Sequence, residues 1–465
     1  MMSRLIMASN HCDVLHKAPV RPLTETLYGV AKQHKALWLG WNGETGKDEQ
    51  NAVSQRELAD CELVNWRLSD QEYGDYYHGY VHKQLWPVFH NRPDLAVYQP
   101  GAFQAYRSYN EKVAERIAEH LCPDDRVWAH DYHLMAVARN LKEAGYLNRC
   151  GFFLHHAFPP GEIFRALPEH DWLMQSLFYY DLLGFQSRND ASHFITWLSR
   201  RYRTEKVTET LFRVNGHLLR VGVFPCGVAP SSAPPVPTPQ HKPRWIVSTD
   251  VISDASGIAW RLAALRQLLE QHPQYLHDVT LVQVCDLARE SPCFTPGLRQ
   301  QLERLCGELN GGYGDFNWSP VNYLHNEPLA PAWRETLYAQ SCVALFTPFC
   351  EGMSLEAKKY ILAQNPADPG VLILSHFTGA AEQLSGALLV NPYDPGELCD
   401  ALHSVLSMPL AERKRRHQQL RQQVCHYNHH WWANAFLSAL NDDRAQTPGR
   451  LLRSPLRLFT PPSRY

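Results

Sequence analysis

Long apolar runs are missing from this sequence. No stretch approaches 18 uninterrupted apolar residues, and the apolar run that begins at Leu5 is brief. A membrane-spanning helix needs about 20 predominantly apolar residues, and the apolar region of a signal peptide needs about 7–15. We therefore expect no membrane contact and no signal peptide, and we interpret the run at Leu5 as a first buried strand of a cytoplasmic protein.

An excess of charge of one sign is also missing. Lys and Arg together number 45, Asp and Glu 47, and the formal net charge is −2. Such a balance creates no overall field toward nucleic acid, so nucleic acid is not expected as a partner. The 12 cysteines are spread from Cys12 to Cys425 without a CxxC pair or a close Cys/His cluster. This pattern favours reduced thiols over a disulfide framework, and it indicates no metal site.

The order of apolar and amphipathic segments predicts the fold. Strand-like runs, among them 36–41, 126–128, 151–154 and 342–346, alternate with helix-length segments such as 110–121 and 258–272. This alternation is typical of parallel sheets covered by helices on both faces. At 465 residues the chain can form two such domains. We expect an α/β protein of two doubly wound, Rossmann-like domains that face each other across a cleft, with ligands at the carboxyl ends of the strands.

A proline-rich stretch, VAPSSAPPVPTPQHKPR at 228–244, marks the domain boundary. Proline fixes φ and lacks an N–H donor, so this stretch continues neither a helix nor a sheet. We expect an N-terminal domain over residues 1–228, a linker over 229–244 and a C-terminal domain over 245–442. The tail 443–465 is rich in Arg and Pro; we expect it to be flexible, with a basic partner-binding role as the alternative.

Six stretches carry a specific pattern. They are LWLGWNGETG (37–46), YYHGYVHKQLWPVFH (76–90), VWAHDYHL (127–134), GFFLHHAFPPGEIFRALP (151–168), YYDLLGFQS (179–187) and FCEGMSLEAKKYILAQNPADPGVLILSHFTGAAEQLSGALLVNP (349–392). In this order they resemble the trehalose-6-phosphate synthases, glycosyltransferase family 20, of the GT-B fold. The resemblance implies transfer of glucose, with retention, from a nucleotide sugar, usually UDP-glucose, to glucose 6-phosphate. It implies no metal or other cofactor.

By this resemblance, Tyr77, Trp86 and Asp131 line the acceptor pocket, and His155 lies at the reacting sugar, so that His155 and Asp131 are the candidate catalytic residues. A carboxylate can accept hydrogen bonds from sugar hydroxyls, and an aromatic ring can cover an apolar sugar face. A neutral imidazole can bond a hydroxyl or the bridging oxygen. A Trp before Pro is also common in packing, and a His-His pair is commonly one buried and one exposed residue.

Two positions bear on the acceptor phosphate. Arg289 stands where the family has a phosphate-binding arginine, although its flanking residues match poorly and an exposed arginine at a helix start is the alternative. The family's second arginine follows Ser-Asn after the first strand, and here the residue is His11. Histidine is shorter, is only partly charged at neutral pH and cannot form the bidentate fork of a guanidinium. We expect weaker or altered binding of the acceptor phosphate.

The donor side departs further from the family. The position of its glycine-rich phosphate loop holds Pro22, which offers no N–H, and Glu25, which adds negative charge. In the family's Glu-Arg-Leu-Asp-Tyr-x-Lys-Gly motif, the Arg position is Val251 and the Lys position is Ser256 when Gly257 is aligned. The two cations that neutralise the diphosphate leaving group are therefore both replaced.

The last motif changes as well. The glutamate that bonds the nucleotide ribose is Lys359 here, while Gly352, Met353 and Leu355 are retained and can still shape the donor pocket. Losing one electrostatic stabiliser typically costs about 10²- to 10³-fold in rate. Several substitutions in one subsite indicate that the use of UDP-glucose is impaired or changed.

Three interpretations follow. The first is an active retaining glycosyltransferase with an altered donor site, which binds a sugar phosphate and a nucleotide sugar. The second is a catalytically inactive paralogue, a pseudoenzyme that binds a sugar phosphate or pairs with an active synthase and regulates rather than catalyses. Self-association into a homo-oligomer and association with an active synthase are the protein partners that we consider. The third is a pseudo-glycosyltransferase that joins cyclitol-type units, but this chemistry also needs binding of the nucleotide phosphates.

Overall fold

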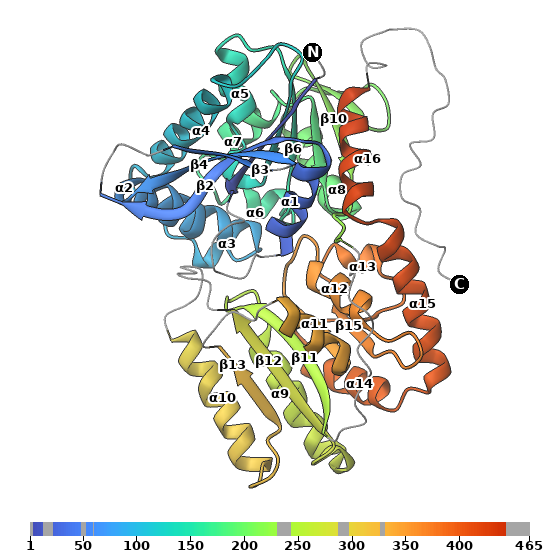
Figure 1. Ribbon diagram of the computed structural model, residues 1–465. Helices are drawn as coiled ribbons and strands as arrows, with labels where there is room; N and C mark the ends of the chain where they lie inside the picture. The colour runs from blue at the N-terminus through green and yellow to red at the C-terminus, as the bar shows by residue number, and fades with distance from the viewer. Residues whose placement is uncertain are drawn as a thin grey trace. The chain divides into compact units, whose positions relative to one another are not determined.

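The computed structural model describes residues 3–12, 22–47, 53–58, 60–229, 243–286, 297–325 and 331–442 (Figure 1). The chain divides into two compact units. Unit 1 contains the described parts of Met1–His16, Leu23–Cys226 and His429–Tyr465, and unit 2 contains those of Lys17–Pro22 and Gly227–Asn428. Residues 230–242 of the predicted linker and all of the predicted tail, 443–465, lie outside the described residues.

Unit 1 is built on a ten-stranded sheet of order β3-β4-β2-β1-β5-β6-β7-β10-β9-β8. The strands are β1 (Leu5–His11), β2 (Leu37–Gly46), β3 (Ser54–Leu58), β4 (Cys61–Ser69), β5 (Arg126–His130), β6 (Arg149–Phe153), β7 (Leu182–Phe185), β8 (Thr204–Lys206), β9 (Leu211–Val214) and β10 (His217–Val223). The seven strands from β4 to β10 in that order are parallel, and β3, β9 and β8 add antiparallel edges. The central strands are apolar almost throughout, as strands buried on both faces require.

The helices of unit 1 lie between these strands in the chain, except for α16, which follows unit 2. They are α1 (Pro22–Gln33), α2 (Asp70–Glu72), α3 (Trp86–Phe89), α4 (Ala102–Ala118), α5 (Val137–Glu143), α6 (Gly161–Phe164), α7 (His170–Leu177), α8 (Arg188–Arg201) and α16 (His429–Asn441), with 3₁₀ turns at Pro93–Leu95 and Tyr132–Leu134. Between α2 and α3 the chain runs as a π-helix over Tyr73–Leu85. π-Helical turns are rare and occur often at functional sites, and this one carries Tyr77.

Unit 2 is built on a six-stranded parallel sheet of order β13-β12-β11-β14-β15-β16. The strands are β11 (Arg244–Val251), β12 (Val279–Asp286), β13 (Val321–Leu324), β14 (Ser341–Phe346), β15 (Val371–Ser375) and β16 (Leu388–Val390). The helices are α9 (Ile258–Gln271), α10 (Leu298–Tyr313), α11 (Pro331–Gln340), α12 (Leu355–Ala363), α13 (Ala380–Gln383), α14 (Pro395–Leu406) and α15 (Leu410–His426), and a 3₁₀ turn lies at Pro273–Tyr275. Its core is separate from that of unit 1.

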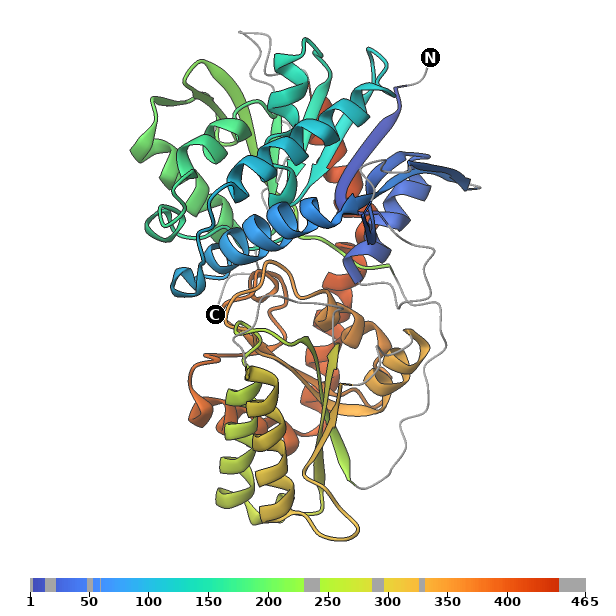
Figure 2. The ribbon, with the colours of Figure 1, turned by 90° about the vertical axis from the view of Figure 1, so that its left-hand side faces the viewer.

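The last described helix, α16, packs on the sheet of unit 1, at β6 and β7 (Figure 2). Two glycines make this contact close, because a Cβ on Gly151 or Gly184 would lie 2.7 or 2.8 Å from ring atoms of Phe436. The Phe436 ring also stacks on Trp128 with centroids 4.4 Å apart. The sequence placed this segment in the C-terminal domain, 245–442, because periodicity predicts a helix without telling which sheet its apolar face covers.

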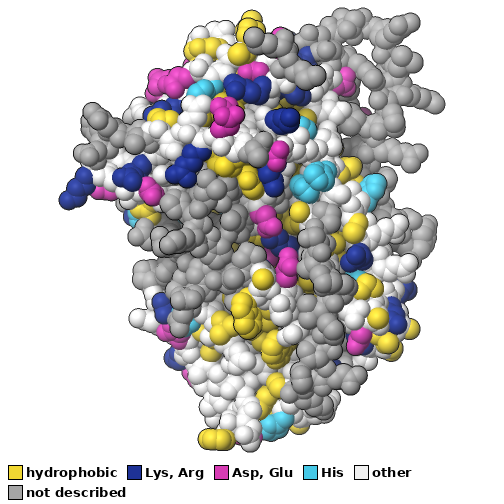
Figure 3. All heavy atoms as spheres, in the orientation of Figure 1, with side chains coloured by type: hydrophobic (Ala, Val, Ile, Leu, Met, Phe, Trp, Pro, Cys, Tyr) yellow, Lys and Arg dark blue, Asp and Glu magenta, His cyan; other side chains and the backbone are white. Residues whose placement is uncertain are grey.

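Surface composition agrees with the balanced charge. On the described part of the face drawn in Figure 3, Lys and Arg side chains are interspersed with Asp and Glu side chains. Within the described ranges, no helix is both long enough and apolar enough to cross a membrane.

Candidate active site

In unit 1, polar side chains gather where β5 and β6 end. Asp131 follows β5 directly, with φ +73°, a value that non-glycine residues rarely adopt. Its backbone N–H donates to Phe153 O at the end of β6 (2.7 Å), and its carboxylate accepts a bond from the backbone N–H of His155 (3.3 Å). These two hydrogen bonds thus join the ends of β5 and β6, while Asp131 keeps its unusual backbone conformation. Strain of this kind persists where the surrounding structure enforces it, often at functional sites.

Three imidazoles surround the Asp131 carboxylate. His156 Nδ1 lies 2.9 Å from it, His133 Nδ1 lies 3.9 Å from it, and His155 is next along the chain from His156. Burial alone would raise the pKa of Asp131, but these neighbours outweigh burial and hold its pKa well below the usual range. Asp131 is therefore ionised at neutral pH and available to accept hydrogen bonds from hydroxyl groups.

His155 is buried and neutral. Burial lowers its pKa to about 4, although Asp131 opposes the shift. Its Nε2 lies 3.2 Å from Nδ1 of His130, whose pKa is lowered well below its usual value, again by burial. His155 Nδ1 is buried and has no hydrogen-bond partner among the described residues. One ring nitrogen is thus fixed by His130, and the other can bind a hydroxyl or a bridging oxygen.

Aromatic rings connect the remaining predicted acceptor residues to Asp131. Trp86, 8% exposed, stacks on His90 with centroids 4.1 Å apart, and the His90 ring contacts His156 at 5.3 Å. On the other side, the ring centroid of Tyr77 lies 6.4 Å from that of His133. The structure therefore brings Tyr77, Trp86, Asp131 and His155 together within unit 1.

His11 joins the same group. Its Nε2 lies 3.4 Å from the Tyr77 hydroxyl, and its ring packs on Trp41 at 4.5 Å. His11 is thus held beside the cluster by the rings of Tyr77 and Trp41. Arg289, the other predicted phosphate-binding residue, lies outside the described residues.

Sequence reasoning missed several members of this cluster. His90 and His133 lie inside the family motifs, but nothing in the sequence singles them out. Trp432 of α16 was also missed; its ring lies 5.8 Å from His155 and 6.1 Å from His130. The only sign in the sequence is the aromatic density of HHWWANAF.

Unit 2 presents a second group of polar residues at the carboxyl ends of its strands. Asp250, the penultimate residue of β11, accepts hydrogen bonds from Arg261 Nη2 (2.8 Å), Gln283 Nε2 (2.8 Å) and Ser248 Oγ (3.0 Å). Arg261 lies on α9 and is 0% exposed. Its guanidinium also donates to the carbonyl of Ser256 (3.0 Å). The arginine is therefore held inside the unit by a carboxylate.

A second arginine of unit 2 is held in the same way. Arg334 of α11 is buried and lies 3.2 Å from the carboxylate of Glu356, which also accepts a hydrogen bond from Tyr338 (2.7 Å). Neighbouring Glu351 has its pKa raised to about 7, chiefly by burial and further by the charges of Asp250 and Glu356. This edge of the sheet thus combines two carboxylate–arginine pairs with a glutamate that is only partly ionised at neutral pH.

The substituted donor positions have ordinary local roles. Val251 ends β11 and is 40% exposed, and Ser256 is buried with its hydroxyl donating to Ser253 O (2.7 Å). Pro22 is the first residue of α1, where a missing N–H is tolerated, and Glu25 lies in the first turn of that helix. Lys359 lies on α12 and is half-buried.

The positions that match the family's last motif form the turn into α12. Gly352, Met353 and Leu355 are buried there, and the backbone of Glu351 is fixed by bonds with Phe377 and Gly379, each of 3.1 Å. Within the described ranges, no group of three or more His, Cys, Asp or Glu side chains is placed to hold a metal ion.

Comparisons with known proteins agree with this architecture. A family profile described as glycosyltransferase family 20 matches residues 7–442. The trehalose-6-phosphate synthase of Citrobacter koseri is 36% identical over 471 residues, which cover 98% of this chain and 99% of that protein.

Two solved structures are similar over nearly the whole chain. An α,α-trehalose-phosphate synthase (UDP-forming) from Burkholderia xenovorans in complex with glucose 6-phosphate has a TM-score of 0.89 and 32% identity, and covers 95% of this chain and 100% of its own. An Escherichia coli structure bound with UDP-2-fluoro glucose has a TM-score of 0.86 and 35% identity, and covers 94% and 99%. The predicted α/β fold of GT-B type is thereby confirmed. The chain belongs to glycosyltransferase family 20, as a trehalose-6-phosphate synthase-like member.

Proposed function

We propose that this protein binds a phosphorylated glucose-type acceptor in unit 1 and transfers a glucosyl unit to it with retention, while its use of UDP-glucose is impaired or changed. One contrast carries the proposal. Asp131, His155, Tyr77 and Trp86 form an ordered cluster, whereas the two buried arginines of unit 2 are each held by a carboxylate. Because both arginines are engaged in this way, the observation supports the view that they do not replace the family's cations at Val251 and Ser256.

In unit 1, the chemistry of the cluster supports binding of such an acceptor. Asp131 stays ionised and can accept hydrogen bonds from two sugar hydroxyls, because its pKa is low. His155 stays neutral, so its free ring nitrogen can bond an oxygen near the anomeric carbon without placing a positive charge there. Tyr77 and Trp86 offer ring faces to the sugar.

In unit 2, the leaving group is poorly supported. Transfer breaks the bond between the anomeric carbon and a diphosphate oxygen, and the departing nucleoside diphosphate carries the negative charge away. Nearby cations normally stabilise that charge. Here Arg261 and Arg334 are already paired with Asp250 and Glu356, and the ionised fraction of Glu351, whose pKa is raised to about 7, would repel a diphosphate. This observation also favours the second candidate function, a non-catalytic sugar-phosphate-binding paralogue that regulates an active synthase.

The deciding experiment is calorimetric titration of the protein with glucose 6-phosphate, UDP and UDP-glucose, followed by a turnover assay. We expect binding of glucose 6-phosphate and weak or absent binding of both nucleotides. Restoring the family cations by Val251→Arg with Ser256→Lys should raise kcat/KM for UDP-glucose by about 10²-fold if the chain is an enzyme.

Two further results separate the alternatives. Glucose 6-phosphate binding without turnover, even in the restored variant, would identify the regulatory paralogue. Micromolar UDP-glucose binding by the unchanged protein would contradict the proposed donor impairment. A matched control, Arg266→Lys on the exposed part of α9, should leave every titration unchanged.

A further inference from the structure

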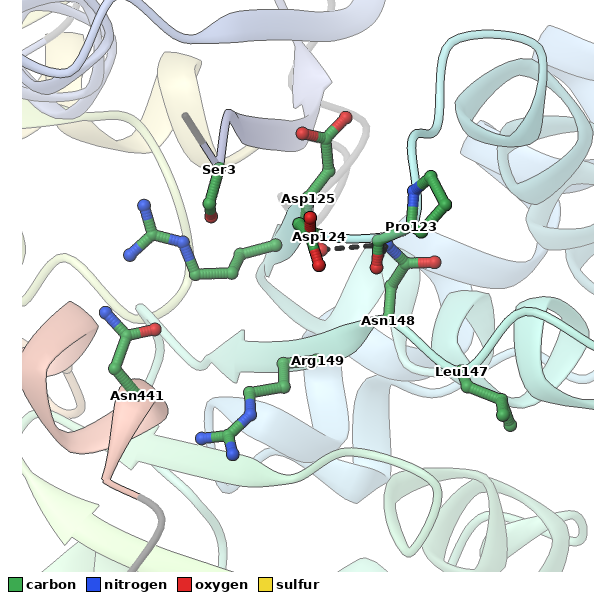
Figure 4. Close-up of a pocket in the computed structure, with 9 residues that line it drawn as sticks. Ser3, Pro123, Asp124, Asp125, Leu147, Asn148, Arg149 and Asn441 are labelled. Carbon is green, nitrogen blue, oxygen red and sulfur yellow. Dashed lines mark hydrogen bonds between the residues drawn. The ribbon is translucent and has the colours of Figure 1, made fainter. Parts of the chain in front are cut away.

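The carboxyl ends of β5 and β6 offer proton chemistry that their amino ends do not. At the amino ends, a pocket of about 510 Å³ is lined by two arginines and two aspartates, whose charges balance each other (Figure 4). At the carboxyl ends, an ionised carboxylate lies among several imidazoles. One of these imidazoles, His156, differs from the others in its partner and in its exposure.

His156 is bound directly to Asp131. Its Nδ1 lies 2.9 Å from the carboxylate. Burial opposes the ionisation of Asp131, but its histidine neighbours, His156 foremost, hold its pKa well below the usual range. An ionised carboxylate can only accept hydrogen bonds, so Nδ1 of His156 carries the hydrogen and donates it. In the neutral ring the second nitrogen, Nε2, then carries a lone pair.

That lone pair is accessible. The His156 side chain is 29% exposed, and no hydrogen bond or ion pair of its Nε2 is found among the residues that the structure describes. The ring is held by Tyr132, with centroids 4.6 Å apart, and by His90 at 5.3 Å. His90 in turn stacks on Trp86. His156 is therefore next to two groups predicted to bind the acceptor, the Asp131 carboxylate and the ring pair of Trp86 and His90.

His155, the predicted catalytic histidine, has the opposite properties. It is buried, and burial lowers its pKa to about 4, which makes it a poor proton acceptor. Its Nε2 lies 3.2 Å from Nδ1 of His130, and a second neutral imidazole does not fix which nitrogen carries the hydrogen. His155 therefore suits a hydrogen bond to a sugar oxygen, whereas His156 has the carboxylate partner and the exposure that a general base needs.

We propose that His156, oriented by Asp131, is the general base that deprotonates the attacking hydroxyl of the acceptor. This rests on the proposed transfer to a phosphorylated glucose-type acceptor. The hydroxyl oxygen forms a bond to the anomeric carbon of the donor while the bond from that carbon to the diphosphate oxygen breaks. The hydroxyl proton passes to Nε2 of His156, and the electron pair of the broken bond leaves with the nucleoside diphosphate. Asp131 stabilises the imidazolium that forms, and water then removes the proton.

The base assists the reaction at the end opposite to the weakened one. With the family's cations replaced at Val251 and Ser256, the leaving group gains less stabilisation, and each such loss typically costs about 10²- to 10³-fold in rate. A general base typically contributes about 10²- to 10⁴-fold. Activation of the acceptor hydroxyl by His156 is thus large enough to offset the loss of at least one cation.

The test is turnover and calorimetry with the full chain, as the wild type and as the restored variant, Val251→Arg with Ser256→Lys. We expect His156→Gln to lower kcat at least 100-fold in both backgrounds, with little change in the Kd of glucose 6-phosphate. The amide of Gln can still donate to Asp131, but it cannot take up the proton. Added imidazole should restore part of the turnover of His156→Ala, because the side chain is partly exposed. His217→Gln, at an exposed histidine of β10, is the matched control.

Each outcome decides the proposal. An unchanged kcat in His156→Gln, with turnover in the wild type, would overturn the base and leave the proposed function standing. Weaker binding of glucose 6-phosphate with an unchanged kcat would assign His156 to acceptor binding alone. A loss of kcat in His156→Ala that imidazole does not restore would assign it a structural role. Binding of glucose 6-phosphate without turnover in both backgrounds would contradict the proposed transfer, and the base with it.

Discussion

Replacing Asp250 with Asn should destabilise unit 2 strongly. Asp250 is the counter-charge of Arg261, which is 0% exposed and lies 2.8 Å away. Asn preserves the shape and an acceptor oxygen, so the bonds from Gln283 and Ser248 can persist, but the charge of Arg261 is left unpaired in the interior. Breaking a buried ion pair in this way costs about 3–5 kcal/mol.

A double-mutant cycle isolates the pair. Arg261→Met removes the cation and keeps most of the side-chain volume, and alone it should also cost about 3–5 kcal/mol because Asp250 stays buried and charged. In the double variant no charge is left uncompensated. We therefore expect the double variant to be more stable than the sum of the single changes predicts, by about 2–3 kcal/mol.

The assay must report on unit 2, because a chain of two compact units need not unfold in one step. Hydrogen exchange of peptides from β11 and α9, with urea as the perturbant, gives the local unfolding free energy. Arg266→Met is the matched control on α9, where an exposed pair with Glu308 at 3.3 Å should contribute less than about 1 kcal/mol. A cost for Asp250→Asn below about 1 kcal/mol, or additive changes, would refute the reasoning and leave Arg261 free to serve the donor.

Three other predictions test single features. Glu351→Gln should flatten the pH dependence of stability. The pKa of Glu351 rises from 4.5 to about 7 on folding, so the wild-type protein should lose up to about 3 kcal/mol of stability relative to the variant between pH 4.5 and 8. Thermal melts across that pH range measure this loss. Asp131→Asn should weaken binding of glucose 6-phosphate at least tenfold in calorimetry yet still fold, because Asn keeps the side-chain shape and an oxygen that can accept from the backbone N–H of His155, whereas Asp131→Ala loses that bond and should lose stability as well. Gly151→Ala should reduce the free energy of unfolding by about 1–3 kcal/mol and so lower the melting temperature, since the added Cβ would lie 2.7 Å from the Phe436 ring. An unchanged melting temperature would show that α16 can move away from the sheet.

The local pattern of apolar residues predicted the strands and the helix that position the two candidate sites. The apolar runs at 126–128 and 151–154 correspond to β5 and β6, and the segment 258–272 corresponds to α9. Because ligand-binding residues follow the carboxyl ends of parallel strands, Asp131 and His155 could be placed side by side before any coordinates. Their roles in binding and catalysis stay predictions.

Non-local packing could not be predicted in the same way. The π-helix at Tyr73–Leu85 has no periodic signature, although it orients Tyr77. Arg261 has the sequence context of a surface helix residue, and its burial depends on Asp250 and Gln283 from two different strands. The position of α16 depends on Gly151 and Gly184, whose lack of side chains is a signal only when the partner helix is known.

The charges at the two candidate sites lead to one last prediction. In unit 1 the ordered groups are a carboxylate, Asp131, and imidazoles kept neutral by burial; the pKa values of His155 and His133 are lowered to about 4. These groups favour the hydroxyls of a sugar, while none of them supplies a fixed positive charge at neutral pH. By the family resemblance, Arg289 and His11 are the candidates for binding the acceptor phosphate. Comparing glucose with glucose 6-phosphate in calorimetry measures the gain in affinity from the phosphate directly. We expect Arg289→Gln to remove most of it, whereas a gain that persists in Arg289→Gln and falls with rising pH would assign the phosphate to His11.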